Sequence, residues 1–153
     1  MFSEKQLIFI ISLPRSGSTL LQRLLTSNDA FDSCAETWML LPLFYATSMY
    51  SVFAEYGHTN AVKGIREFID LLPDKELTFH QSIKELYLDL IGKVSPSNDI
   101  YFIEKTPRNA LIIDDLLETF KESKFIFLWR HPGAIVSSII DTWGGGRWNV
   151  YKY

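Results

Sequence analysis

The sequence is short of cysteine, and it contains no long hydrophobic run. Its single cysteine, Cys34, excludes an internal disulfide and is typical of a protein from a reducing compartment. The apolar run of residues 7–11 is too short to span a membrane, and it follows Glu4 and Lys5 without the small-residue cleavage site of a secretory signal. We therefore expect a mature N-terminus, no membrane span and a cytoplasmic location.

An excess of positive charge is also lacking. The chain has 15 Lys and Arg against 18 Asp and Glu, a formal net charge of −3, so no global charge attracts nucleic acid or an anionic membrane. Any cation that binds an anion must act through its position. Hydrophobic residues make up 47% of the sequence and charged residues 22%, and residues 1–153 leave room for one domain with a sizeable core.

A strand, a tight loop and a helix are predicted over residues 6–26. The apolar run 7–11 has no polar alternation, which indicates a strand buried on both faces of a parallel sheet. Leu20, Leu21, Leu24 and Leu25 then fall on one face of a 3.6-residue repeat. Between the two elements, backbone N–H groups at a helix N-terminus and the positive end of the helix dipole favour an anion.

The loop itself reads Pro14-Arg15-Ser16-Gly17-Ser18-Thr19. It lacks the first glycine and the lysine of the GxxxxGK[ST] pattern of nucleotide triphosphatases. Instead, it resembles the 5′-phosphosulfate-binding loop of sulfotransferases that use 3′-phosphoadenosine 5′-phosphosulfate (PAPS). The resemblance implies that residues 15–19 bind the donor. Together with the alternation of strands and helices, it implies a three-layer α/β/α domain with a parallel sheet and a P-loop nucleoside triphosphatase-like fold.

The middle of the chain is predicted to be mostly helical. Residues 31–35 form a short second strand, which puts Glu36 at a carboxyl end, the edge where ligands bind in open α/β sheets. Residues 38–56 have no clean period and predict a broken helix whose aromatic side chains belong to the core or line an acceptor pocket. Two amphipathic helices follow over residues 61–72 and 78–94, the second with a capping box at Thr78.

Strand and helix alternate again from residue 99. Residues 100–103 predict a strand, and Thr106 and Pro107 predict the cap and the first position of a helix. Lys105 then lies at the tip of the strand, level with the loop of residues 12–19. The sequence Glu-Lys-Thr-Pro-Arg-Asn resembles the lysine-bearing segment of bacterial carbohydrate-type and tyrosylprotein sulfotransferases. Thr106 departs from the aspartate that is usual there.

A second motif follows residues 125–129, which have the pattern of a buried strand. The next helix carries an apolar face that includes Trp143, with Ser138 on the opposite face. Arg130 and Ser138 resemble the pair that grips the 3′-phosphate of PAPS in sulfotransferases. A guanidinium suits this role because it makes bidentate contacts to phosphate.

Sulfuryl transfer places negative charge on the sulfonate oxygens and on the leaving phosphate, so the protein must supply position and positive charge. Arg15 and Lys105 fit this role. The acceptor hydroxyl also needs a base. Cys-Ala-Glu-Thr resembles the segment that provides the base in tyrosylprotein and some bacterial sulfotransferases, which implies Glu36. His80 is the alternative base, and the chemistry requires no metal.

Several alternatives remain open from the sequence. The acceptor can be a carbohydrate, a lipid, a small alcohol or a tyrosine, and the oligomeric state is not indicated. Sulfotransferases usually continue well past the helix that carries the 3′-phosphate serine, so we expect a chain that lacks the C-terminal part of the usual fold. A P-loop kinase of a small molecule and a non-catalytic remnant that binds adenosine 3′,5′-bisphosphate (PAP) or a protein partner are the rival hypotheses.

Overall fold

The computed structural model describes residues 2–50, 52–95 and 100–146. Within these ranges, the strands are β1 (Leu7–Ile11), β2 (Phe31–Ser33), β3 (Tyr101–Glu104) and β4 (Lys124–Phe127). The α-helices are α1 (Ser18–Leu25), α2 (Leu40–Tyr45), α3 (His58–Ile69), α4 (Glu76–Val94), α5 (Ile113–Thr119) and α6 (Pro132–Thr142). Short 3-10 helices at Glu4–Gln6 and Pro107–Ile112 precede β1 and α5.

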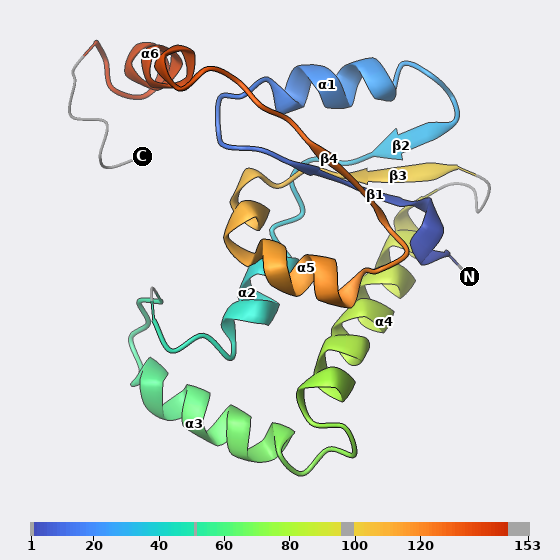
Figure 1. Ribbon diagram of the computed structural model, residues 1–153, viewed down its shortest axis with the longest axis vertical. Helices are drawn as coiled ribbons and strands as arrows, with labels where there is room; N and C mark the ends of the chain where they lie inside the picture. Colours follow the sequence, from blue (N-terminus) through green and yellow to red (C-terminus); the bar gives the residue numbers. More distant parts are fainter. Residues whose placement is uncertain (1, 51, 96–99, 147–153) are drawn as a thin grey trace.

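The four strands form one parallel sheet in the order β2-β3-β1-β4. Strand β1 is central, and each of its residues is buried, as its uninterrupted apolar sequence predicts. Because all the strands are parallel, their carboxyl ends meet at one edge, and the loops that follow β1, β2, β3 and β4 leave from that edge (Figure 1).

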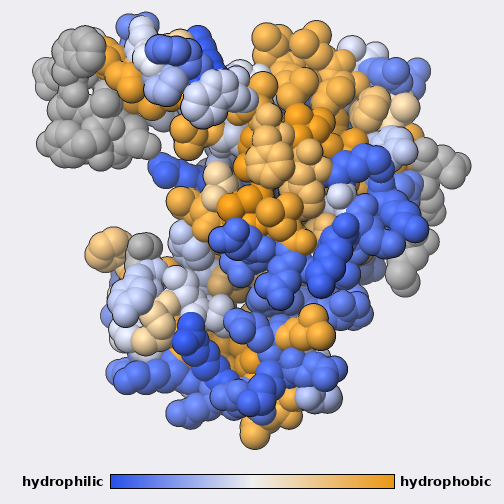
Figure 2. Space-filling view, in the orientation of Figure 1, coloured by the Kyte–Doolittle hydropathy of each residue, from blue (hydrophilic) through white to orange (hydrophobic). Residues whose placement is uncertain are grey.

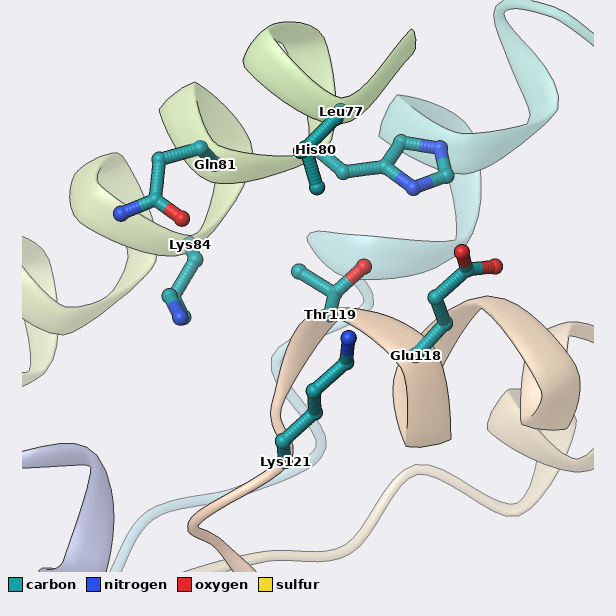
Figure 3. A pocket seen from close by; sticks show the side chains of 7 residues that line it. All are labelled: Leu77, His80, Gln81, Lys84, Glu118, Thr119 and Lys121. Atoms are coloured by element: carbon teal, nitrogen blue, oxygen red, sulfur yellow. The ribbon is translucent and has the colours of Figure 1, made fainter.

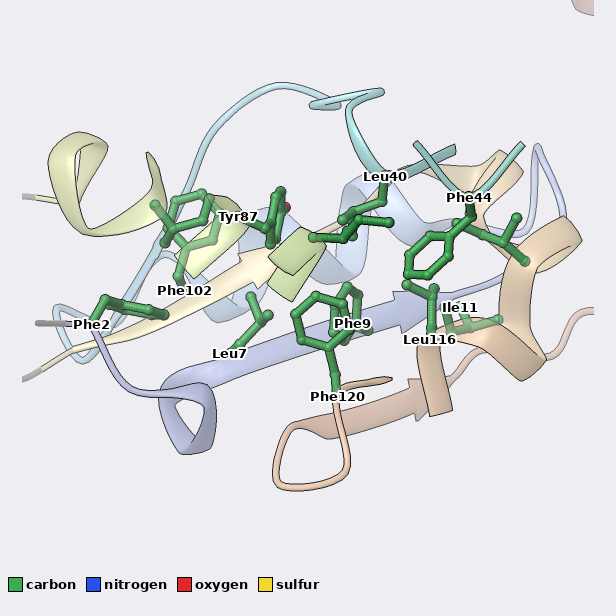
Figure 4. Close-up of a cluster of buried hydrophobic side chains, with 13 residues drawn as sticks. Phe2, Leu7, Phe9, Ile11, Leu40, Phe44, Tyr87, Phe102, Leu116 and Phe120 are labelled. Atoms are coloured by element: carbon green, nitrogen blue, oxygen red, sulfur yellow. The ribbon is translucent and has the colours of Figure 1, made fainter. Parts of the chain in front are cut away.

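Helices cover both faces of the sheet, so the predicted three-layer α/β/α arrangement is confirmed (Figure 1). On one face, residues of α2, α4 and α5 pack on alternate residues of β1, including Phe9 and Ile11, and form the larger core (Figure 4). On the other face, Leu21 and Leu25 of α1 pack against Ile8 and Ile10. Helix α3 lies beyond α2, farther from the sheet (Figure 1).

Two apolar patterns are buried less than their sequences suggest. Leu20 and Leu24 share the apolar stripe of α1, but they are 64% and 62% exposed because none of the described elements covers that side of the helix. Strand β4 reads as a buried strand, but it is the edge strand of the described sheet, and Phe127 is 62% exposed. Figure 2 shows the apolar surface that results where α1 and β4 lie.

Element boundaries differ in places from those predicted. Helix α3 begins at His58 and α4 at Glu76, both earlier than predicted, and the capping box at Thr78 is wrong because that residue lies inside α4. Residues 107–112 form a 3-10 helix before α5. Trp143 does not point inward with the apolar face of α6, since it is the exposed residue that ends the helix.

No helix in the described part of the chain combines the length and the apolarity that crossing a bilayer requires.

Candidate active site

The loop between β1 and α1 has an unusual backbone. Arg15 has φ 66° and Gly17 has φ 96°, so two left-handed residues alternate in a tight turn. Such turns point successive N–H groups into one concavity that binds anions. Gly17 is also the N-cap of α1 and provides no side-chain cap, and a Cβ added at Gly17 would meet no atom within 4 Å. The loop therefore has both the donors and the open space that a phosphate or sulfonate group needs.

The side chains of the loop are arranged around this turn. Ser16 and Ser18 are buried, while Arg15 and Thr19 are exposed. Arg15 Nε donates a hydrogen bond to Ser138 Oγ of α6 over 3.0 Å, and the guanidinium lies 5.8 Å from the ring centroid of Trp143. The loop therefore contacts the helix that carries the second motif.

Arg130, which follows β4, also contacts the loop between β1 and α1. Its Nη1 donates to the carbonyl oxygen of Arg15 over 2.7 Å. The residues predicted to bind the 5′-phosphosulfate and the 3′-phosphate thus lie side by side, although more than a hundred residues separate them in the sequence. Adjacent strands β1 and β4 bring them together, because both motifs follow a strand's carboxyl end.

Glu36 and Lys105 form an ion pair on the other side of the loop. Lys105 Nζ lies 2.7 Å from Glu36 Oε1, and the side chains are 6% and 32% exposed. Lys105 follows β3 directly, and the segment with Glu36 follows β2, which is the neighbour of β3 in the sheet. Gln22 of α1 donates a hydrogen bond to the carbonyl oxygen of Cys34 over 2.9 Å, which attaches the segment with Glu36 to α1.

A cavity of about 300 Å³ has both Arg15 and Glu36 in its lining, while Lys105, Arg130 and Ser138 lie outside that lining. Its lining comes from the loop between β1 and α1, α1 itself, the segment after β2, the segment after β3 and the end of α6: Pro14, Arg15, Ser18, Thr19, Glu36, Trp38, Pro107, Arg108 and Trp143. Its volume is at the lower end of the usual range for ligand pockets. The cavity combines cations and hydroxyls with two exposed tryptophans and one carboxylate, a donor set that suits an anionic group beside a hydroxyl acceptor.

A buried carboxylate lies directly behind the ion pair. Glu104, the last residue of β3, is 1% exposed, and it accepts hydrogen bonds from Tyr87, Thr37, Thr106 and Asn109. Loss of hydration raises the pKa of Glu104 above its ordinary value, against the opposite effect of the four hydrogen bonds. Burial, together with the nearby Glu104 charge, raises the pKa of Tyr87 well above its ordinary value.

The sequence interpretation missed Glu104 because it ended the strand at Ile103. One signal was present: Glu104 has the same alternation phase as Phe102, so a strand extended by one residue turns the carboxylate into the core on the α4 side. A charge at such a position requires hydrogen-bond partners.

His80, the alternative base, lies elsewhere. It lines a separate hollow of about 90 Å³ between α4 and α5, with Lys84, Thr119 and Lys121 among its other walls (Figure 3). This hollow shares no lining residue with the cavity that contains Glu36. Metal-ligating side chains do not cluster in threes anywhere in residues 2–50, 52–95 and 100–146.

Comparison with known proteins agrees with this geometry. The model of the sulfotransferase family matches residues 7–153. The chain belongs to this family. It is also 28% identical over 144 residues to nodulation protein NoeE of Sinorhizobium fredii (strain NBRC 101917 / NGR234), across 89% of the chain and 31% of the relative. The chain thus spans about a third of the length of that relative. Membership of the sulfotransferase family also implies the P-loop-like version of the α/β fold.

Proposed function

We propose that the chain transfers a sulfuryl group from PAPS to a hydroxyl acceptor. One observation carries this proposal: Glu36, whose carboxylate lies 2.7 Å from Lys105 Nζ, lines the same cavity as the loop that contains Arg15, Ser18 and Thr19. A carboxylate and two cations next to an anion-binding turn are the groups that in-line transfer to a hydroxyl needs.

The donor site of the proposal consists of Arg15, Ser16, Gly17, Ser18 and Thr19, with Arg130 and Ser138 for the 3′-phosphate. The left-handed turn at Arg15 and Gly17 supports this assignment, because its N–H groups converge without a side chain to block them. PAPS would supply the activated sulfonate and the leaving phosphate. The hydrogen bonds from Arg15 to Ser138 and from Arg130 to the Arg15 carbonyl support a single extended anion site.

Glu36 is proposed as the general base and Lys105 as a cation that stabilises charge on the transferred group. Glu36 is partly exposed, so an acceptor hydroxyl can reach it, whereas Lys105 is almost fully buried. Removal of water around the ammonium group strengthens its attraction for a developing negative charge. Arg15 would add positive charge from the other side of the cavity.

The acceptor class is a carbohydrate, a lipid, a small alcohol or a tyrosine, and the proposed location is the cytoplasm. The single cysteine, Cys34, is free and exposed, which favours a reducing compartment. The net charge of −3 supports an acceptor other than nucleic acid.

Transfer of radiolabelled sulfate from PAPS to a panel of the four acceptor classes tests the proposal. We expect label on one class, and we expect Glu36→Gln to reduce turnover by about 10²–10⁴-fold, the usual effect of removing a general base. PAP affinity should stay nearly unchanged in this variant, because Glu36 acts only on the acceptor. Unchanged turnover in Glu36→Gln would reject the base and direct attention to His80. Phosphate transfer from ATP without sulfate transfer would favour the rival kinase.

A further inference from the structure

Four hydrogen-bond donors match the acceptor capacity of the Glu104 carboxylate, and they come from different parts of the fold. Tyr87 Oη of α4 donates to Oε2 over 2.6 Å, and Asn109 Nδ2 of the 3-10 helix donates to Oε1 over 3.2 Å. These two partners anchor the carboxylate to the body of the protein. Because an unpaired buried donor or acceptor costs free energy, the cluster has one favoured arrangement.

The other two partners belong to the segments that carry the proposed catalytic groups. Thr37, the neighbour of Glu36, donates from Oγ1 to Glu104 Oε2 over 3.0 Å. Thr106, the neighbour of Lys105, donates from Oγ1 to Oε1 over 2.6 Å. The same Thr106 oxygen accepts a long hydrogen bond of 3.5 Å from the backbone N–H of Trp38. Residues 37 and 38 are therefore both tied to Glu104, one directly and the other through Thr106.

Trp38 shows that this attachment works against a local preference. Its φ of 56° is in the left-handed region, which bulky residues rarely occupy and which costs about 1–3 kcal/mol. Such a conformation persists only where the surroundings impose it. Here it turns the chain between Glu36 and α2, and both Glu36 and Trp38 line the cavity.

The geometry points to Glu104 as a positioning residue that holds the segment Glu36–Trp38 in its active arrangement. It touches neither the cavity nor the acceptor, and acts through Thr37 and Thr106. This inference rests on the proposed function for the role of Glu36, but the attachment of the segment is a property of the fold. An experiment on the fold alone therefore separates the two.

The test uses the whole chain labelled with 5-fluorotryptophan and fluorine NMR. The four tryptophans give four lines, and Trp38→Phe assigns the line of Trp38. Thr37→Val and Thr106→Val each remove one hydroxyl and keep the side-chain shape, so they fold even where Glu104→Ala does not. Glu4→Gln is the matched control, because Glu4 is also a buried carboxylate, hydrogen-bonded to Lys84 Nζ and the backbone N–H of Glu122, but lies before β1 at the opposite end of the strand.

We expect each threonine variant to shift or split the Trp38 line, with the other three lines in place, and Glu4→Gln to leave the Trp38 line unchanged. In the sulfate-transfer assay, kcat should fall at least tenfold in both threonine variants, while the Kd for PAP should change less than twofold. A Trp38 line that stays in place in both variants, or that moves as much in Glu4→Gln, would overturn the inference. Failure of PAP to bind would reject the proposed function and leave the NMR result standing.

Discussion

Substitution of Arg130 by alanine tests the proposed 3′-phosphate site. Arg130 is exposed, and the hydrogen bond from its Nη1 to the Arg15 carbonyl is also exposed, so its removal should cost the fold less than about 1 kcal/mol. The effect on ligand binding should be much larger, because a guanidinium makes charge-assisted, bidentate contacts with phosphate.

The size of the effect follows from the type of contact. A hydrogen bond to a charged group contributes about 1.5–3 kcal/mol, which corresponds to a loss of roughly 10- to 150-fold in affinity for PAP. Adenosine 5′-monophosphate lacks the 3′-phosphate, so its affinity should fall much less in the same variant. The ratio of the two affinity losses measures the contribution of the 3′-phosphate contact, because a disturbance of the Arg15 loop would affect both ligands.

Isothermal titration of both ligands into wild type and Arg130→Ala measures this ratio. Arg23→Ala is a suitable control, since Arg23 is an exposed arginine in the last turn of α1, away from the loop at its N-terminus. Equal losses for the two ligands in Arg130→Ala would refute the assignment, because Arg130 would then act only through the loop. If Arg23→Ala lost as much PAP affinity as Arg130→Ala, the loss would come from the change in net charge and not from a contact with the 3′-phosphate.

Two further predictions concern single residues. Gly17→Ala should lower the free energy of unfolding in urea by about 1–2 kcal/mol, because φ 96° strains any residue with a Cβ. It should also weaken the binding of PAP, because the added Cβ enters the open space of the loop. An unchanged free energy of unfolding would contradict the left-handed turn. Glu104→Gln should change how stability depends on pH. Because the folded-state pKa of Glu104 is raised, its stability contribution is complete below the ordinary value of 4.5 and is lost as pH rises through the folded pKa. The stability of wild type relative to Glu104→Gln should therefore fall as pH rises above 4.5, and a difference that grows with pH would show that the carboxylate is stabilised as the anion.

The strand–loop–helix junctions at the two motifs predicted to bind phosphate show what local sequence predicts well. Both lie where an apolar strand ends and a helix begins, and in a parallel sheet every such junction reaches the same edge. Arg15 and Arg130 could therefore be expected close together, although their contact depends on β1 and β4 being neighbours. The sequence does not show directly that β1 and β4 are adjacent in the sheet. Nor does it show that β2 and β3 are adjacent, which is what brings Glu36 close to Lys105.

Burial was harder to predict than element type. An apolar stripe shows which residues share a face, but it does not show whether another layer covers that face. Leu20 of α1 and Phe127 of β4 are exposed for this reason. Glu104 shows the opposite error, because a carboxylate at the end of a strand suggests a solvated loop until its alternation phase is compared with that of Phe102.

We propose above that the site binds a 3′-phosphorylated adenine nucleotide as its sulfuryl donor. Thermal unfolding of the intact chain with PAP and with ADP tests it most directly. At a hundredfold excess over its Kd, PAP should add about 2.7 kcal/mol to the free energy of unfolding and raise the Tm clearly. ADP at the same concentration should raise the Tm much less. Equal shifts with the two ligands, or no shift with PAP, would contradict the account.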